Sequence, residues 1–130
     1  MFLSSEVLVV AKMRFIREKD AGFFVDAMNA NDVKADFENL EVHLGPLRDS
    51  RFKAKCKVTY DEEMLTMDGG KRVIRMHARN IGNVHLEKKA IRIAAMNFEV
   101  KEGEDVSVVS GSIRLELGDA SKDWYKELWG

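Results

Sequence analysis

Apolar and polar side chains alternate without interruption from Arg51 to Tyr60. One set of alternate positions is apolar and consists of Phe52, Ala54, Cys56, Val58 and Tyr60. The other set consists of Arg51, Lys53, Lys55, Lys57 and Thr59. Because neighbouring side chains of a β-strand point to opposite faces of the sheet, this stretch predicts a strand with one buried face and one cationic face.

Similar apolar patterns predict further strands along most of the chain. Their ranges are 6–16, 33–44, 64–67, 71–81, 85–101 and 106–117. Turn-forming residues separate them, most clearly at 45–46, 68–70 and 102–105, and 80–83 is a further predicted loop or turn. The apolar pattern changes phase between Phe37 and Leu40, between Ala95 and Met96, and between Val108 and Val109. Such changes indicate bulges or bends, for which Gly111 is a suitable position, and strongly bent hairpins are typical of small barrels.

Two short helices complete the predicted elements. The first follows Asp20, has Phe23, Phe24, Ala27 and Met28 on one face, and ends within 29–32. The second lies at the C-terminus, with Asp119 or Ser121 as its cap and Trp124, Tyr125, Leu128 and Trp129 on its apolar face. We therefore expect an α+β, mainly β fold. It is a curved antiparallel sheet or small β-barrel with one short helix in the N-terminal half and a C-terminal helix.

Length and composition narrow the class of protein. A chain of 130 residues, 45% hydrophobic and 33% charged, predicts a single folded domain over 1–130. No apolar run approaches the roughly 18 residues of a membrane span, and no basic leader precedes an apolar block, so we expect no membrane partner. The single cysteine forms no internal disulfide and favours a reducing, cytoplasmic location.

Charge is unevenly distributed along the sequence, although the net charge is only −1. Residues 48–92 contain twelve Lys and Arg against six Asp and Glu, whereas both flanking segments have more acidic than basic residues. The acidic flanks either fold back and neutralise the basic middle or leave it exposed as an anion-binding surface. A third arrangement pairs basic and acidic surfaces between chains, which makes the protein a self-associating homo-oligomer.

The cationic positions suggest an anionic partner, and nucleic acid is the partner we favour. The predicted ligand-binding residues are Arg51, Lys53, Lys55 and Lys57 on one strand and Arg75, His77 and Arg79 on another. Proteins that bind single strands usually place aromatic side chains among the basic ones so that bases stack on them. Here Phe52 and Tyr60 belong to the apolar face. The pattern therefore predicts a non-enzymatic module that contacts the charged backbone more than the bases.

Candidate chemistry is sparse, and we predict no catalytic residue, metal or cofactor. Cys56 lies on the apolar face of its strand, which indicates a buried structural cysteine. His43, His77 and His85 lack the spacing of a metal site. An enzyme built from residues scattered over the fold remains the least favoured class.

One partial motif resembles a known family. Arg75 and Arg79 have the Arg-x-x-x-Arg spacing of PilZ-type cyclic-dinucleotide receptors, and Asp105 with Ser107 resembles the start of their Asp/Asn-x-Ser-x-x-Gly motif. In this chain Ser110 occupies the position of the final glycine, which follows one residue later as Gly111. The resemblance implies a small β-barrel that binds a cyclic dinucleotide, as a lesser alternative.

Overall fold

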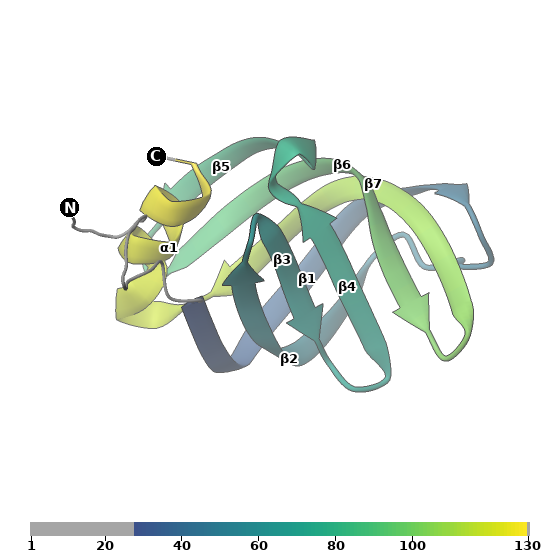
Figure 1. Cartoon of the computed structure of the whole chain (residues 1–130), viewed down its shortest axis with the longest axis horizontal. Helices are drawn as coiled ribbons and strands as arrows, with labels where there is room; N and C mark the ends of the chain where they lie inside the picture. Colours follow the sequence, from purple (N-terminus) through teal and green to yellow (C-terminus); the bar gives the residue numbers. More distant parts are fainter. Residues whose placement is uncertain (1–27, 130) are drawn as a thin grey trace.

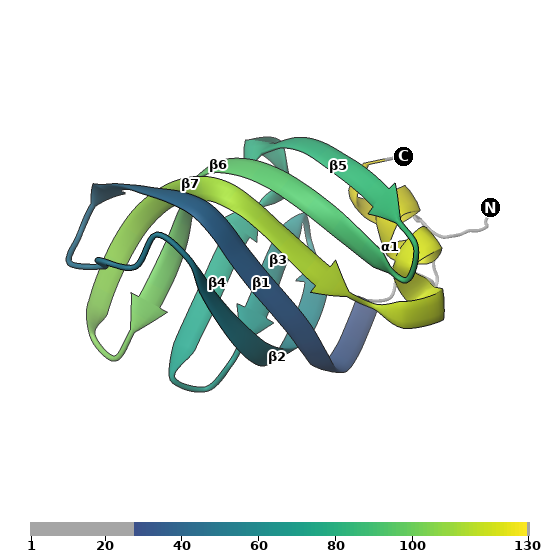
Figure 2. The same ribbon diagram turned by 180° about the vertical axis from the view of Figure 1, so that it is seen from behind.

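The computed structural model describes residues 28–129, and this part of the chain forms an antiparallel β-barrel with a C-terminal helix. Its strands are β1 (Met28–Leu44), β2 (Phe52–Asp61), β3 (Met64–Asp68), β4 (Arg72–His77), β5 (Ile81–Glu87), β6 (Ala90–Glu102) and β7 (Asp105–Glu116). The sheet order is β4-β3-β2-β1-β7-β6-β5, and pairing of β4 with β6 closes the barrel (Figures 1 and 2). The predicted fold class is confirmed.

The barrel interior is filled by the apolar side of each strand. On β2, Cys56 and Val58 are buried, while Phe52, Ala54 and Tyr60 are partly buried and pack against the same core. This confirms the apolar face predicted for the alternating stretch. Phe52 stacks on Phe37 of β1, with 4.5 Å between the ring centroids. The opposite, outer face of β2 consequently faces away from the core.

Bulges bend the two longest strands at the predicted places. In β1 the pairing with β7 shifts between Glu38 and Glu41, and Asn39 has a φ of 55°. In β6 the pairing with β7 shifts between Ala95 and Phe98. Gly111 lies against the β1 bulge, and a Cβ there would be 3.0 Å from the backbone oxygens of Glu38 and Asn39, so this close approach favours glycine. The bulges allow one strand to pair with different neighbours along its length.

The phase change expected in β7 is wrong. Ser107, Val109, Ile113 and Leu115 all lie on the buried face, whereas Val106 is 43% exposed. Ser107 is only 2% exposed, and its hydroxyl accepts a hydrogen bond of 3.0 Å from the Leu47 amide. A buried serine whose hydroxyl group has a hydrogen-bond partner can occupy a core position. Because Ser107 is polar, the continuous alternation of buried and exposed residues in β7 was not recognised from the sequence.

Two strand boundaries also differ from the prediction. The range 71–81 is broken by a 3-10 turn, η1 (Ala78–Asn80), so that β5 begins at Ile81. The range 85–101 is broken by a turn at 88–89, where Lys89 has a φ of 62°. The first break ends at Asn80, where the loop predicted at 80–83 begins, whereas the second contains no glycine, proline or asparagine and so no turn signal.

Helix α1 (Ser121–Leu128) follows a second 3-10 turn, η2 (Gly118–Ala120), and packs at one end of the barrel against β5 and β6 (Figure 1). Trp124 is 1% exposed, as expected for the apolar face. Trp129 is 45% exposed because the helix ends at Leu128, so its assignment to that face is wrong. The predicted caps are also wrong, since Ala120 occupies the N-cap position without a side-chain bond.

The remaining predictions concern the N-terminal part of the chain. The strand at 6–16 and most of the helix after Asp20 lie outside the described residues. The predicted end of that helix, within 29–32, is instead part of β1. Asn29 and Ala30 pair with Thr59 and Val58 of β2, so cross-strand pairing extends β1 in a way that the local sequence does not indicate.

Candidate functional site

The cations of the alternating stretch form one row on the outside of the barrel. Arg51, Lys53, Lys55 and Lys57 are all exposed. Strand geometry separates alternate side chains by about 6.6 Å, so the four positive charges extend along about 20 Å, from Arg51 just before β2 to Lys57 within it. Within residues 28–129, none of these four side chains is in an ion pair. We call this set the β2 row.

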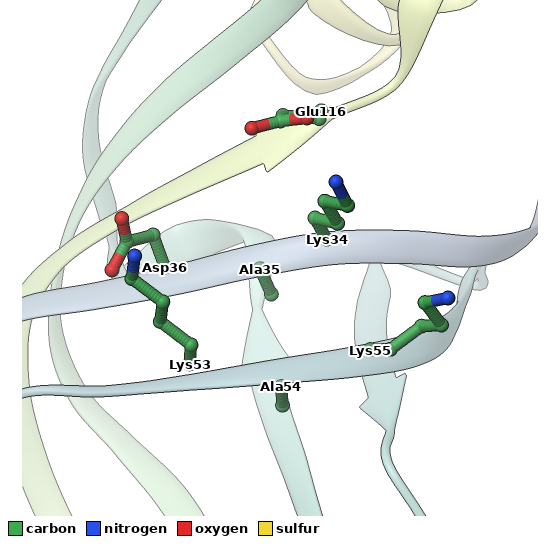
Figure 3. A pocket seen from close by; sticks show the side chains of 7 residues that line it. All are labelled: Lys34, Ala35, Asp36, Lys53, Ala54, Lys55 and Glu116. Atoms are coloured by element: carbon green, nitrogen blue, oxygen red, sulfur yellow. The ribbon is translucent and has the colours of Figure 1, made fainter.

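Neighbouring strands add both signs of charge beside the β2 row. In the strand register, Asp36 of β1 lies opposite Lys53, and Asp68 of β3 lies opposite Lys57. Lys34 of β1 lies opposite Lys55 and adds another cation. Figure 3 shows Lys53 rising beside Asp36, whereas the Lys55 ammonium group points away from that carboxylate. The centre of the row at Lys55 is therefore its most positive part.

The second predicted group lies apart from the first, because β3 separates β4 from β2. Arg75 faces outward between Thr66 of β3 and Glu99 of β6. His77 is half-buried, with Nε2 3.9 Å from Glu63 Oε1, and its Nδ1 accepts a 3.1 Å bond from the Arg79 amide. Arg79 itself lies in η1. The structure thus separates Arg75, His77 and Arg79 from the β2 row.

A contrasting surface covers β5, β6 and β7. Glu87 accepts bonds from Arg92 Nε at 3.0 Å and from Arg114 Nε at 2.9 Å. Arg92 also pairs with Glu38, and Arg114 also pairs with Glu116, at 3.1 and 2.9 Å. Hydrogen bonds from Arg114 and Arg92 lower the pKa of the Glu87 carboxyl group. We call these five residues the arginine network, in which each cation is neutralised by carboxylates.

Arg72 is neutralised in a similar way near the start of β4. Its guanidinium pairs with Asp49 at 2.6 Å and Glu102 at 3.2 Å. It also lies over the Phe52 ring, 4.3 Å from the centroid. Because Phe37 stacks on the same ring, Phe52 has no free face on which a base could stack.

Cys56 is buried, as the sequence predicted, with 3% exposure. Burial, assisted by the charge of Asp68, raises the pKa of the Cys56 thiol to about 11. The Sγ atom donates to the carbonyl oxygen of Val33 at 3.7 Å. Since the thiolate is the nucleophilic form, this environment suits a structural role.

Sequence reasoning missed one pair of chemically interesting residues, His43 and Ser110. His43 Nε2 lies 2.7 Å from Ser110 Oγ, although 67 positions separate them in the sequence. Ser110 Oγ also accepts a 3.1 Å bond from the Asn97 amide at the β6 bulge. Among the described residues no carboxylate bonds to His43, so the third group that orients a catalytic base is missing. The pair instead holds the bulge against β1.

The PilZ-like motif residues are not gathered into one site. Ser107 faces the barrel interior, and its hydroxyl already accepts the Leu47 amide. Asp105 pairs with Glu102 near Arg72, at the start of β4, whereas Arg79 follows the opposite end of that strand. This arrangement gives the cyclic-dinucleotide alternative no geometric support.

Other kinds of site receive little support from the part of the chain that is described. No group of three or more His, Cys, Asp or Glu side chains is arranged to hold a metal ion between residues 28 and 129. The same residues include no helix with the length and apolar character needed to cross a bilayer. Comparison of the chain with protein-family models, with curated proteins and with solved structures gives no match.

Proposed function

We propose that this barrel is a non-enzymatic binding module that engages an anionic partner, the phosphate backbone of a nucleic acid, through the β2 row. The observation that carries the proposal is the row itself, in which four exposed cations follow one face of β2 from the residue before it, and none of them is in an ion pair with a described residue. Phosphate contacts made by lysine and arginine supply most of the non-specific affinity of proteins for nucleic acids. A row of cations about 6.6 Å apart suits such a repeating charge.

The proposed contact is with phosphates rather than with bases. Phe52 is covered by Phe37 and Arg72, and Tyr60 is partly buried among core residues. Burial raises the pKa of the Tyr60 hydroxyl to about 12, with smaller effects from Glu63 and Glu127. Base stacking needs exposed aromatic faces, and the β2 row has none beside it among the described residues. We therefore expect weak sequence preference and strong salt dependence.

The second predicted group, Arg75, His77 and Arg79, has a secondary place in this proposal. Arg75 is exposed, but it lies two strands from β2 and beside Glu99. A partner that contacts it together with the β2 row must extend across β3. We expect substitution of Arg75, His77 or Arg79 to weaken binding less than substitution within the β2 row.

The test uses a fluorescently labelled oligonucleotide of 20 nucleotides, single-stranded and as a duplex, in a titration at several salt concentrations. With four phosphate contacts, the logarithm of the association constant should fall against the logarithm of salt with a slope of about −2.8 for the single strand. Lys53→Glu combined with Lys55→Glu should reduce affinity by on the order of a hundredfold at 0.1 M salt and make the slope shallower.

A matched control reverses the charge of two exposed lysines outside the β2 row. Lys88 lies in the turn between β5 and β6, and Lys122 lies on α1, so Lys88→Glu with Lys122→Glu makes the same change in net charge. The control should keep most of the affinity. Equal binding by wild type and the Lys53/Lys55 variant would refute the proposal.

Self-association through complementary charges remains the alternative prediction. Glu38, Glu102 and Glu116 of the acidic flanks are already paired within the chain, which leaves fewer carboxylates for contacts between chains. Sedimentation at low and high salt distinguishes the two ideas. A species larger than the monomer that forms only at low salt, without nucleic acid, would favour self-association.

A further inference from the structure

Two lysines face each other directly on the outside of the barrel. Lys34 of β1 and Lys55 of β2 are register partners, and both are exposed. Like charges at opposed positions of an antiparallel pair destabilise the sheet. The next outward pair along the same two strands, Asp36 with Lys53, has opposite charges. The Lys34–Lys55 pair is therefore the electrostatically unfavourable position on this surface.

The surroundings compensate Lys34 better than Lys55. On its other side Lys34 pairs with Glu116 of β7, and Figure 3 shows its side chain extending toward the strand that carries this carboxylate. On its β3 side, Lys55 is next to the turn that contains Gly69. The two residues are in close contact, since a Cβ added to Gly69 would lie 3.7 Å from the Lys55 carbonyl oxygen. The nearest carboxylate on that strand, Asp68, accepts the Gly70 amide at Oδ1, 2.8 Å away.

A shallow depression lies between these two lysines. It has a volume of about 460 Å³, and Lys34, Lys53 and Lys55 line it together with Asp36 and Glu116. Its floor is the backbone of β1 and β2 at Ala35 and Ala54, whose side chains point away from the depression and toward the barrel core (Figure 3). The lysine side chains are long and flexible enough to turn toward a group placed between them.

We propose that Lys34 and Lys55 form a two-lysine anchor that holds one phosphate group of the anionic partner. This inference rests on the proposed function and assigns Lys34, which lies outside the β2 row, to the binding site. A bound phosphate neutralises the like-charge pair, so the arrangement that is unfavourable in the free protein becomes favourable in the complex. Asp36 and Glu116 border the anchor and limit where the phosphate can lie.

The experiment compares three single variants: Lys34→Gln, Lys55→Gln and the control Lys88→Gln. Binding of the labelled 20-nucleotide single strand and thermal unfolding of the free protein are both measured. Loss of one phosphate contact should weaken binding by about fivefold at 0.1 M salt and make the salt slope shallower by about 0.7. We expect this change for Lys34→Gln and for Lys55→Gln, and no change for Lys88→Gln.

Thermal unfolding separates a binding role from a structural one. Lys55→Gln removes the repulsion from Lys34, so its melting temperature should stay the same or rise by about 1 to 4 °C while its affinity falls. Normal binding by Lys34→Gln alongside weakened binding by Lys55→Gln would overturn the anchor but leave the proposed function standing. A lower melting temperature for Lys55→Gln would also overturn it, because the two lysines would then not repel each other. If neither the Lys53/Lys55 reversal nor any of these variants changes binding, the proposed function itself fails.

Discussion

Two outer surfaces of the same barrel use their cations differently. In the arginine network, Arg92 and Arg114 share Glu87 and each has a further carboxylate partner. In the β2 row, four exposed cations have no ion pair with any described residue. Arginine presents a planar fork that suits fixed pairs with carboxylates, whereas lysine, which supplies three of the four cations in the β2 row, is a flexible, strongly hydrated charge. The difference indicates that the first surface stabilises the fold and that the second is available to a partner.

The uneven charge along the sequence is only partly balanced in the folded barrel. The acidic flanks do neutralise part of the basic middle, since Glu102 pairs with Arg72 and Glu38 pairs with Arg92. They do not reach the lysines of β2 in the same way. The acidic flanks therefore neutralise part of the basic middle, while the lysines of β2 stay exposed without an ion pair to any described residue.

The largest expected effect on stability comes from the centre of the arginine network. Glu87→Gln removes the charge that both arginines contact, and we expect the free energy of unfolding to fall by about 1 to 2 kcal/mol. Urea denaturation at neutral pH measures the change. Glu104→Gln, at an exposed position in the turn between β6 and β7, is the matched control and should change stability by less than about 0.5 kcal/mol. Equal losses in the two variants would remove the distinction between the surfaces.

The pH dependence of stability should reveal the same carboxylate. The pKa of Glu87 is lowered from its ordinary value of 4.5 by the two arginines, so its contribution is fully present above that value. It is lost as the pH falls through the lower pKa of the folded protein. The stability difference between wild type and Glu87→Gln should therefore be constant from pH 7 to 5 and shrink below 4.5. A difference that stays constant down to pH 3 would contradict the assignment.

Glu116 lies where the two surfaces meet, because it pairs with Arg114 and also sits across from Lys34. Glu116→Gln should lower the free energy of unfolding by less than about 1 kcal/mol. It should also raise affinity for a nucleic acid by about two- to fivefold, since a competing carboxylate beside Lys34 is removed. The labelled-oligonucleotide titration measures the gain, and a loss of affinity would mean that Glu116 supports the site rather than limits it.

The smallest expected effect is on the stability contributed by the β2 row. Lys53→Gln combined with Lys57→Gln should change the free energy of unfolding by less than about 0.5 kcal/mol, because exposed lysines that form no ion pair with the opposite carboxylates contribute little to folding. Urea denaturation tests this directly beside Glu87→Gln. A loss as large as that of Glu87→Gln would show that the row is part of the structural charge balance.

The sequence predicted the fold where local alternation decides it. The apolar face of β2 and the bulges near Asn39 and Met96 follow from side-chain periodicity, which reports burial directly. The turn signal at 80–83 places a break near Asn80, but β5 already begins at Ile81, and the turn at 88–89 could not be predicted because it contains no glycine, proline or asparagine. Trp129 was misplaced because the end of a helix depends on the last tertiary contact more than on the local pattern.

The candidate site was predictable only within one strand. The β2 row follows from alternation, but the proximity of Lys34 to Lys55 depends on strand register, which local periodicity does not fix. The partners of the paired arginines are equally remote in sequence, as with Arg92 and Glu38, 54 positions apart. The same limit explains why Arg75, His77 and Arg79 were grouped with β2, although β3 lies between the strands.

Chemical footprinting of lysines tests the central claim most directly. The protein is acetylated with and without an excess of the 20-nucleotide single strand at low salt, and the modification of each lysine is measured by mass spectrometry. We predict several-fold protection of Lys34, Lys53, Lys55 and Lys57, with Lys88 and Lys122 modified equally in both samples. Uniform protection of all lysines, or protection of Lys88 and Lys122 without the β2 row, would contradict the account.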